Sequence, residues 1–325
     1  MESIRIKRLI KKAISWAGLF FFIIAAIMLY SQLSKYEPAD IKNALLDIPT
    51  GNILAACAAS FFGYIALSSY DYLALRYIGR HLEAWKWIFV GFVGFSVSNN
   101  AGHAVVSGGA VRYRLYTRWR FKPNEIVRMV TFSGFTYLIA CFFLSDLGWI
   151  LTPNHAFEGA EASQWTTNLV AFISFIGLIG YFGLCQFYKK TVKIRNIPFK
   201  MPSVKMAIAQ VIIGGCDILM ASFVLYFCLM PFVHIPFDIF IGVFIIAQVL
   251  GVFSQVPGGL GVFEGLFLAI LPNDANVAHL FGALIAYRII YYVLPLIFSG
   301  VALFSYEGYR GYRYRKLHEN TTAKK

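Results

Sequence analysis

Long apolar runs separated by short polar loops make up most of this chain. Runs that approach the length of a membrane-spanning helix cover residues 13–33, 52–77, 87–106, 126–151, 166–188, 204–230, 237–256, 260–271 and 277–304. A helix needs about 20 mostly apolar residues to cross the hydrocarbon core of a bilayer. The pattern therefore predicts an all-α fold, a polytopic transmembrane helical bundle, built as a single domain over residues 1–325.

Composition excludes a soluble protein. The chain is 58% hydrophobic and only 14% charged, which is far too apolar for a soluble domain of this length. The run at 13–33 is longer than the core of a signal peptide and precedes no small-residue cleavage site, so we expect it to remain as a first transmembrane helix. The five cysteines lie in apolar runs without paired spacing. We interpret them as small buried hydrophobic residues and expect no metal and no cofactor.

The positions of the basic residues predict which loops face the cytoplasm. A net charge of +13 would suit nucleic acid, but the charges form short clusters between apolar runs, as the positive-inside rule describes. If the run at 87–106 dips into the membrane and returns to the same side, nearly all of the 29 Lys and Arg residues fall on one face. If it spans, basic clusters lie on both faces. We therefore predict a re-entrant hairpin here, cytoplasmic N- and C-termini, and a basic cytoplasmic tail over residues 306–325.

The same assignment of loops to the two faces of the membrane requires a second hairpin at residues 237–271, which enters from the opposite side. Each hairpin follows a helix with one acidic residue and precedes a helix with one arginine: Asp71 and Asp217, then Arg128 and Arg288. Opposed broken elements that meet near the midplane are typical of transporters built as inverted repeats. Coincidence between two glycine-rich interruptions is the alternative. We expect about six full spans plus two oppositely oriented re-entrant hairpins, with repeats at about 52–151 and 204–305.

The first hairpin contains a polar, glycine-rich break within residues 91–114. Its polar and small residues are Ser96, Ser98, Asn99, Asn100, Gly102, Gly108 and Gly109. We expect the backbone to leave helical geometry here, because glycines and hydrogen-bonding side chains compete with the helix. Non-helical backbone at membrane depth is tolerated only where it is buried in protein or lines a wet cavity. The break therefore predicts the floor of a site.

Ionisable residues inside apolar runs are candidates for function, because a charge at the bilayer centre costs about 2.5 to 3.5 kcal/mol. These residues are Asp71, Asp217, Glu264 and Arg288. Asp71 lies near Arg76 and could instead belong to an interfacial ion pair. Arg288 lies too deep to reach the interface comfortably, so it needs a partner such as Glu264 or a lipid phosphate.

Two arginines after the first break are candidates for phosphate binding. Arg112 and Arg114 follow Gly108 and Gly109, and could hold a phosphate together with backbone N–H groups at the start of a helix. Positive-inside charge is the alternative for both. His103 is a candidate proton carrier or polar contact. Enzyme templates fit poorly, because the chain has no Walker loop, no metal-spaced histidine pair and no Gly-x-Ser-x-Gly elbow.

Three stretches in this order resemble the membrane domain of bacterial lysylphosphatidylglycerol synthases, a group that includes the multiple peptide resistance factor and its stand-alone relatives. They are residues 98–102 with 108–112, residues 257–264 with the turn Pro-Gly-Gly-Leu-Gly, and Tyr287 with Arg288. The resemblance covers nearly the whole chain. In full-length members this domain is associated with moving aminoacylated phospholipid to the outer leaflet, while a separate cytoplasmic domain makes the lipid. This chain stops at Lys325, so the resemblance implies a translocase-like module without lysyl transfer, and no enzyme.

We therefore expect a flippase-like translocase of the bacterial inner membrane that moves phospholipid, aminoacylated or not, between leaflets. Arg112 and Arg288 would engage the lipid phosphate, and Asp71 and Glu264 a cationic headgroup or a proton. The expected lipid-binding residues are Asp71, Asn99, Asn100, Gly102, His103, Gly108, Gly109, Arg112, Arg114, Asp217, Pro257, Gly258, Gly259, Gly261, Glu264, Tyr287 and Arg288.

Two other functions stay open at this point. One is an ion-coupled transporter of a small soluble solute, which would share the inverted repeat. The other is a non-transporting membrane subunit of a lipid-modifying enzyme. The expected partners are membrane phospholipids, with a lipid-synthesis enzyme and a homo-oligomer as further candidates, and without nucleic acid.

Overall fold

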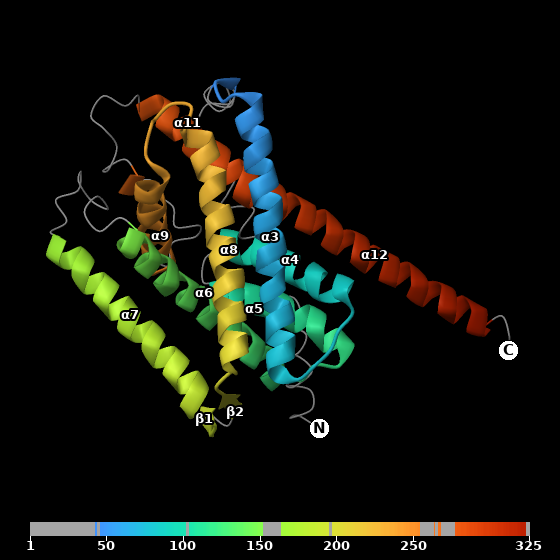
Figure 1. Ribbon diagram of the computed structural model, residues 1–325. Coiled ribbons are helices and arrows are strands. Elements are labelled where there is room, and N and C mark those ends of the chain that lie inside the picture. Colours follow the sequence, from blue (N-terminus) through green and yellow to red (C-terminus); the bar gives the residue numbers. More distant parts are fainter. Residues whose placement is uncertain are drawn as a thin grey trace.

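The computed structural model describes residues 43, 46–101, 104–151, 164–194, 197–253, 263, 266–267 and 277–322. These residues form a helical bundle with one small two-stranded hairpin at its edge (Figure 1). The helices are α3 (Thr50–Ile78), α4 (Ala84–Ala101), α5 (Ala104–Tyr116), the 3-10 turn η1 (Thr117–Trp119), α6 (Pro123–Leu151), α7 (Gln164–Phe187), α8 (Val204–Leu229), α9 (Phe237–Phe253), α11 (Val277–Arg288), the π-helical segment η3 (Ile289–Val293) and α12 (Leu294–Thr322).

Within the described part of the chain, four segments are long and apolar enough to cross a membrane. They are α3, most of α6, α8, and the continuous segment His279–Tyr312. Two further apolar helices, Ala171–Phe187 and Phe237–Gly251, are shorter. These lengths confirm a helical membrane protein. The number of spans and the re-entrant character of the hairpins stay predictions, and the first expected span at 13–33 lies outside the described residues.

Helices α3 and α8 form the centre of the bundle and lie side by side (Figure 1). They run antiparallel, because the Asn52 side chain bonds to the Phe227 carbonyl at one end while Tyr70 bonds to Asp217 further along. Glycines let them approach closely. A Cβ at Gly63 would lie 3.2 Å from the Cβ of Met220, as expected where membrane helices use small residues at their interfaces.

Helices α4 and α5 form an antiparallel hairpin on the α3 side of the bundle. Gly94 faces Arg112 and Gly108 faces Ser98 across this hairpin. The two outer ends of the hairpin lie together. Arg80, which precedes α4, contacts Glu125 of α6, and 3.7 Å separates Arg80 Nε from Glu125 Oε1. The helices therefore leave and return at the same end of the bundle.

The break in this hairpin is narrower than the sequence suggests. The expectation that Gly108 and Gly109 leave helical geometry is wrong, since both lie inside α5, and Ser96, Ser98, Asn99 and Asn100 lie inside α4. The described helices stop at Ala101 and resume at Ala104. The glycines serve packing, because the helix supplies their backbone bonds and the missing side chains admit the neighbouring helix.

Two further features concern the edges of the bundle. Strands β1 (Thr191–Ile194) and β2 (Ile197–Lys200) pair antiparallel where an all-α fold predicts only a basic loop. Their alternating apolar and polar residues favour a hairpin. Helix α12 continues to Thr322 and projects from the bundle (Figure 1), so the residues expected as a basic tail are helical as far as Thr322. Of the second expected hairpin, the structure describes α9, Phe263, Leu266 and Phe267.

Candidate functional site

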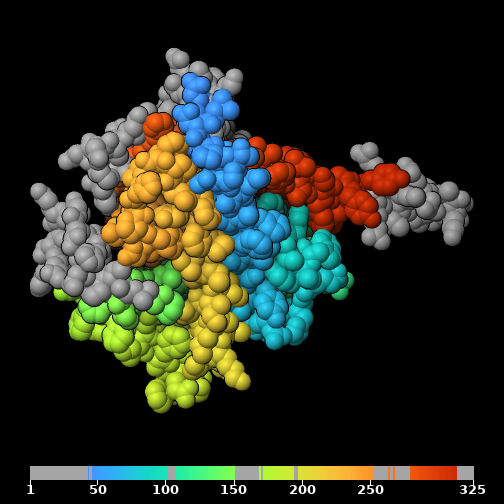
Figure 2. Space-filling view, turned by 45° about the horizontal axis from the view of Figure 1, so that its top comes forward, coloured from blue at the N-terminus to red at the C-terminus, as the bar shows by residue number. Residues whose placement is uncertain are grey.

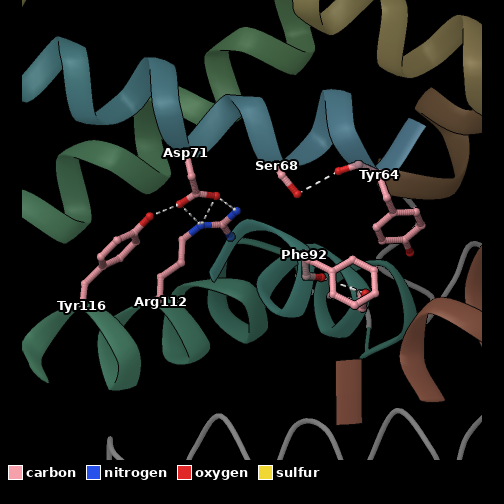
Figure 3. Close-up of polar contacts among 7 residues, drawn as sticks. Tyr64, Ser68, Asp71, Phe92, Arg112 and Tyr116 are labelled. Atoms are coloured by element: carbon pink, nitrogen blue, oxygen red, sulfur yellow. Dashed lines mark hydrogen bonds and ion pairs between the residues drawn. The ribbon is translucent and has the colours of Figure 1, made fainter. Parts of the chain in front are cut away.

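A buried ion pair joins the hairpin to the central helix α3. Arg112 of α5 donates from Nε to both oxygens of Asp71, at 3.0 and 3.2 Å, and from Nη2 to Oδ2 at 2.7 Å (Figure 3). The two side chains are 4% and 0% exposed. Tyr116 lies one turn beyond Arg112 and donates its hydroxyl to Asp71 Oδ1 at 2.9 Å. The carboxylate therefore accepts three donor groups from one helix face, a strong charge-assisted arrangement.

The sequence around Arg112 makes room for its guanidinium. A Cβ at Gly94 would lie 3.2 Å from Arg112 Nη1, and a Cβ at Gly108 would lie 3.0 Å from the same atom. The guanidinium carbon also lies 4.4 Å from the ring centroid of Phe95, a favourable cation-π distance. Helix α4 thus provides an aromatic surface and a glycine gap, both of which match a planar, delocalised cation.

A second buried carboxylate lies on the other side of α3. Asp217 of α8 accepts from Tyr70 at 3.0 Å and from Tyr291 at 3.4 Å. Tyr70 and Asp71 are adjacent in α3, so the same turn of this helix carries one carboxylate and binds the other. The ring of Phe95 also contacts that of Tyr70, with centroids 5.4 Å apart. Phe95 therefore lies between the Arg112 guanidinium and the Tyr70 ring, and connects the two clusters.

The structure changes the predicted roles of both α5 arginines. The ion pair of Asp71 with Arg76 is wrong, because Asp71 binds Arg112 and Arg76 instead lies over the Tyr72 ring. Arg112 and Arg114 do not follow a helix start, since α5 begins at Ala104. Arg114 Nη2 donates to Glu307 of α12 at 3.0 Å, and Arg118 Nη2 binds the same oxygen. Arg114 thus helps to hold α5 on α12.

The π-helical segment η3 is held by side chains from two other helices. Ser60 and Tyr64 of α3 donate to the carbonyls of Ile290 and Tyr291, both at 3.1 Å. Asn100 of α4 donates to the Tyr292 carbonyl at 3.2 Å. Pro295 has no N–H, so the Tyr291 carbonyl has no α-helical donor four residues later. The Tyr64 hydroxyl supplies that missing bond, and a π-helical turn of this kind is frequent at functional sites.

The predicted residues Tyr287 and Arg288 lie at the end of α11, beside this segment. Tyr287 is fully buried and stacks between the rings of Phe263 and Tyr291, at centroid distances of 5.6 and 5.7 Å. Its hydroxyl has no hydrogen-bond partner among the residues that the structure describes. Arg288 is 8% exposed, and its guanidinium carbon lies 4.8 Å from the Tyr292 ring centroid. Both residues therefore lie inside the bundle, near Asp217 through Tyr291.

The structure brings together part of the predicted residue set. Asp71, Gly108 and Arg112 meet at the face of α3 on which the hairpin packs, and Asn100 reaches η3 from the same hairpin. Asn99 lies beside it in α4, whereas Gly109 faces away from Ser98, toward Val130. The other predictions lie outside the described residues: Gly102, His103, Pro257, Gly258, Gly259, Gly261 and Glu264.

Sequence reasoning missed the aromatic residues that complete these clusters. Tyr116 could have been found, because it lies four residues after Arg112 on the same helix face. Phe95, Tyr70 and Tyr291 carry no such signal, since aromatic residues are common throughout an apolar chain. No group of three or more His, Cys, Asp or Glu residues in the described ranges is placed to hold a metal ion.

The comparison with known families decides what kind of protein this is. The model of the lysylphosphatidylglycerol synthase TM region matches residues 14–299, which is most of the chain. The chain belongs to this family. The resemblance inferred from residues 98–112, 257–264 and 287–288 is thereby confirmed.

Several relatives share this membrane region. The uncharacterized protein slr0712 of Synechocystis sp. is 31% identical over 297 residues, which cover 89% of this chain and 90% of that protein. The inner membrane protein YbhN of Escherichia coli is 26% identical over 298 residues, 90% of this chain and 91% of that protein. The phosphatidylglycerol lysyltransferase of Staphylococcus xylosus is 24% identical over 286 residues, which are 87% of this chain but 32% of that protein.

Proposed function

We propose that this chain is a phospholipid translocase, flippase-like in action, of the bacterial inner membrane. It carries the phospholipid, aminoacylated or not, between leaflets along the face where the α4 and α5 hairpin packs on α3. In this proposal the chain crosses the membrane several times, has both termini in the cytoplasm, and performs no covalent chemistry. Membership in the family and the match to an inner membrane protein support the location.

The observation that carries the proposal is the buried pair of Asp71 and Arg112. Desolvating two charges is expensive, and replacing a buried pair by packed apolar residues is often neutral or stabilising. Charged groups inside a membrane bundle mark substrate or proton pathways by default. A pair that bridges a hairpin and a central helix is therefore better explained by a working role than by stability alone.

The geometry suggests how a lipid would use this pair. Asp71 holds Nε and Nη2 of Arg112, while Nη1 points to the gap at Gly94 and Gly108. A lipid phosphate can offer the guanidinium the same bidentate acceptor as a carboxylate. In our proposal the phosphate exchanges with Asp71 at Arg112. The released Asp71 then accepts a cationic headgroup or a proton, so charge stays compensated through the exchange.

The second half of the path involves the other cluster. Asp217, Tyr287 and Arg288 lie around the η3 segment. Glu264, which lies outside the described residues, is proposed from the sequence as the partner of a headgroup or proton. In an inverted repeat, α3 and α8 are equivalent elements, and their antiparallel contact through Tyr70 and Asp217 supports that assignment. The re-entrant path of α4 and α5 is supported by the contact between Arg80 and Glu125, which places both ends of the hairpin together.

A proteoliposome assay tests the role of Arg112. Movement of a fluorescent anionic phospholipid between leaflets is followed by an external quencher, for the native protein and for Arg112→Gln. We expect the variant to lose about tenfold or more in rate, which corresponds to about 1.4 kcal/mol. Arg80→Gln is the matched control, because Arg80 is 40% exposed and lies outside the path.

The outcome of this assay separates the proposal from a structural role. Loss of movement in folded Arg112→Gln and in Glu264→Ala, with native rates in Arg80→Gln, supports it. Native rates in both site variants would contradict the assignment of these residues. Stable capture of a lipid-modifying enzyme, without movement by the chain alone, would favour the role of a non-transporting subunit.

A further inference from the structure

An apolar groove lies on the outer surface of the bundle where α3, α4 and α12 meet. Its volume is about 470 Å³, within the range of about 300 to 1,000 Å³ that is usual for ligand pockets. Figure 2 shows α3 bordered by α8 on one side and by α4 and α12 on the other. Residues from all three helices line the groove: Cys57, Phe61, Ile65, Trp87, Ile88 and Phe298.

The surface of the groove is apolar, and the hydroxyl groups that line it donate their hydrogen bonds within the protein. Ser60 donates to the Ile290 carbonyl, Tyr64 to the Tyr291 carbonyl, and Ser68 to the Tyr64 carbonyl at 2.8 Å (Figure 3). Each lining hydroxyl is therefore satisfied inside the protein. A polar solute would find no donor here to replace its water, so the groove suits an apolar ligand.

One end of the groove carries a cation and two interfacial aromatic residues. Trp87 lines the groove, and its ring centroid lies 5.4 Å from that of Tyr72. The guanidinium carbon of Arg76 lies 5.8 Å from the Tyr72 centroid. No carboxylate among the described residues forms an ion pair with Arg76. Trp, Tyr and Arg in this order are typical of the level of lipid headgroups.

The length of the groove matches one leaflet. Its α3 residues run from Cys57 to Ser68, which is about 16 Å of helix at 1.5 Å per residue. The hydrocarbon core of a bilayer is about 30 Å thick, so one leaflet contributes about 15 Å. We propose that this groove binds one acyl chain of an anionic phospholipid whose phosphate lies at Arg76. The inference rests on the proposed function and names where the substrate docks before it enters.

The groove is connected to the buried clusters through the segment η3. Ile290, Leu294 and Pro295 form one of its walls. On the inner side of the same segment, Tyr291 reaches Asp217, and the Tyr292 carbonyl accepts from Asn100 of the hairpin. An acyl chain in the groove would therefore contact η3, the segment that makes both of these polar bonds. The docked lipid would lie beside the buried residues that would receive its headgroup.

Photo-crosslinking tests the groove. Native protein in vesicles of phosphatidylethanolamine and phosphatidylglycerol receives a trace of phosphatidylglycerol with a diazirine on one acyl chain, and adducts are mapped by mass spectrometry. We expect adducts at Ile65, Trp87 and Phe298 to exceed those on the exposed apolar face of α7 by about tenfold, a difference of about 1.4 kcal/mol. The α7 face serves as the internal reference, with Phe172 60% and Ile176 52% exposed.

Three variants sharpen the result. Ile65→Trp fills the groove and should abolish the excess labelling, whereas Leu54→Trp should retain it. Leu54 is an exposed residue of α3 that does not line the groove. Arg76→Gln should remove the preference for phosphatidylglycerol over a phosphatidylcholine probe. Even labelling of all exposed faces, or excess labelling that survives Ile65→Trp, would overturn the inference.

The leaflet assay on the same proteins keeps this inference distinct from the proposed function. Localised labelling by a protein that moves no lipid would support the groove as a lipid site and contradict the translocase. Movement of lipid with even labelling would support the translocase and overturn the groove.

Discussion

At the scale of single residues, one buried pair carries the proposed function, and its two members can be found in the sequence although their contact cannot. The sequence indicates Asp71 because a charge in an apolar run is costly, and Arg112 because it follows the glycines Gly108 and Gly109. Their pairing is not indicated, since 41 positions separate them and Arg76 is a nearer cation. The aromatic partners Phe95 and Tyr116 belong to residue types that fill this chain and give no signal of their own.

The two members of the buried pair should not contribute independently to stability. Arg112→Ala leaves the Asp71 carboxylate buried without its cation, and we expect a loss of about 3 to 5 kcal/mol in the free energy of unfolding. The double variant Asp71→Ala with Arg112→Ala should lose less than the sum of the single variants. Unfolding in mixed micelles measures all three.

A surface pair provides the control for this cycle. Arg80 and Glu125 lie 3.7 Å apart with side chains 40% and 23% exposed, and such pairs couple by about 0 to 1 kcal/mol. If the coupling energy of Asp71 and Arg112 were as small as that of the surface pair, the importance given to the buried pair would be contradicted.

At the scale of elements, the hydrophobic pattern predicted where most helices lie and misjudged what the glycines do. Helices α3, α6 and α8 fall within a few residues of the apolar runs at 52–77, 126–151 and 204–230. The placement of basic residues predicts a hairpin at 87–106, whose re-entrant path stays a prediction, whereas the glycines that the pattern indicates as breaks lie inside α5. Whether a helical glycine frees the backbone or admits a neighbour depends on tertiary contacts, which the pattern does not contain.

Two adjacent glycines of α5 give opposite expectations. A Cβ at Gly108 would lie 2.7 Å from Ser98 Oγ and 3.2 Å from the Gly94 carbonyl, so Gly108→Ala should separate α4 from α5 and lower stability. A Cβ at Gly109 would lie 3.9 Å from Val130, an ordinary contact. Gly109→Ala should be neutral or stabilising by up to about 1 kcal/mol, because alanine favours the helix.

Thermal unfolding of the two alanine variants in the same detergent distinguishes these expectations. The expected outcome is a midpoint for Gly109→Ala equal to or above that of the native protein, and a clearly lower midpoint for Gly108→Ala. Equal midpoints for the two variants would mean that the hairpin does not pack as closely as described.

At the scale of the whole molecule, composition and charge placement predicted a multi-helix membrane bundle, and the family match confirmed its kind. The central pairing of α3 with α8 and the helical continuation of α12 could not be predicted. Pairing depends on which small residues admit a neighbouring helix, as Gly63 does toward Met220 and Gly214 toward Ala140, and many glycines in the chain are equally plausible candidates.

Accessibility of introduced cysteines tests the membrane topology. In a cysteine-free chain, Glu83→Cys and Lys122→Cys mark the two ends of the hairpin, and Asp47→Cys marks the opposite end of α3. A membrane-impermeant maleimide should label the first two from the cytoplasmic face and the third from the other face. Labelling of Glu83→Cys and Lys122→Cys from opposite faces would rule out a re-entrant hairpin.

The central claim, that the chain moves phospholipid across the membrane, is tested most directly by the leaflet assay on the native protein alone. Vesicles carry a headgroup-labelled anionic phospholipid in both leaflets, and an impermeant quencher is added outside. The account predicts that label from the inner leaflet becomes accessible in vesicles with correctly inserted protein and stays protected in empty vesicles. Continued protection in the protein-containing vesicles, with the protein folded and inserted, would contradict it.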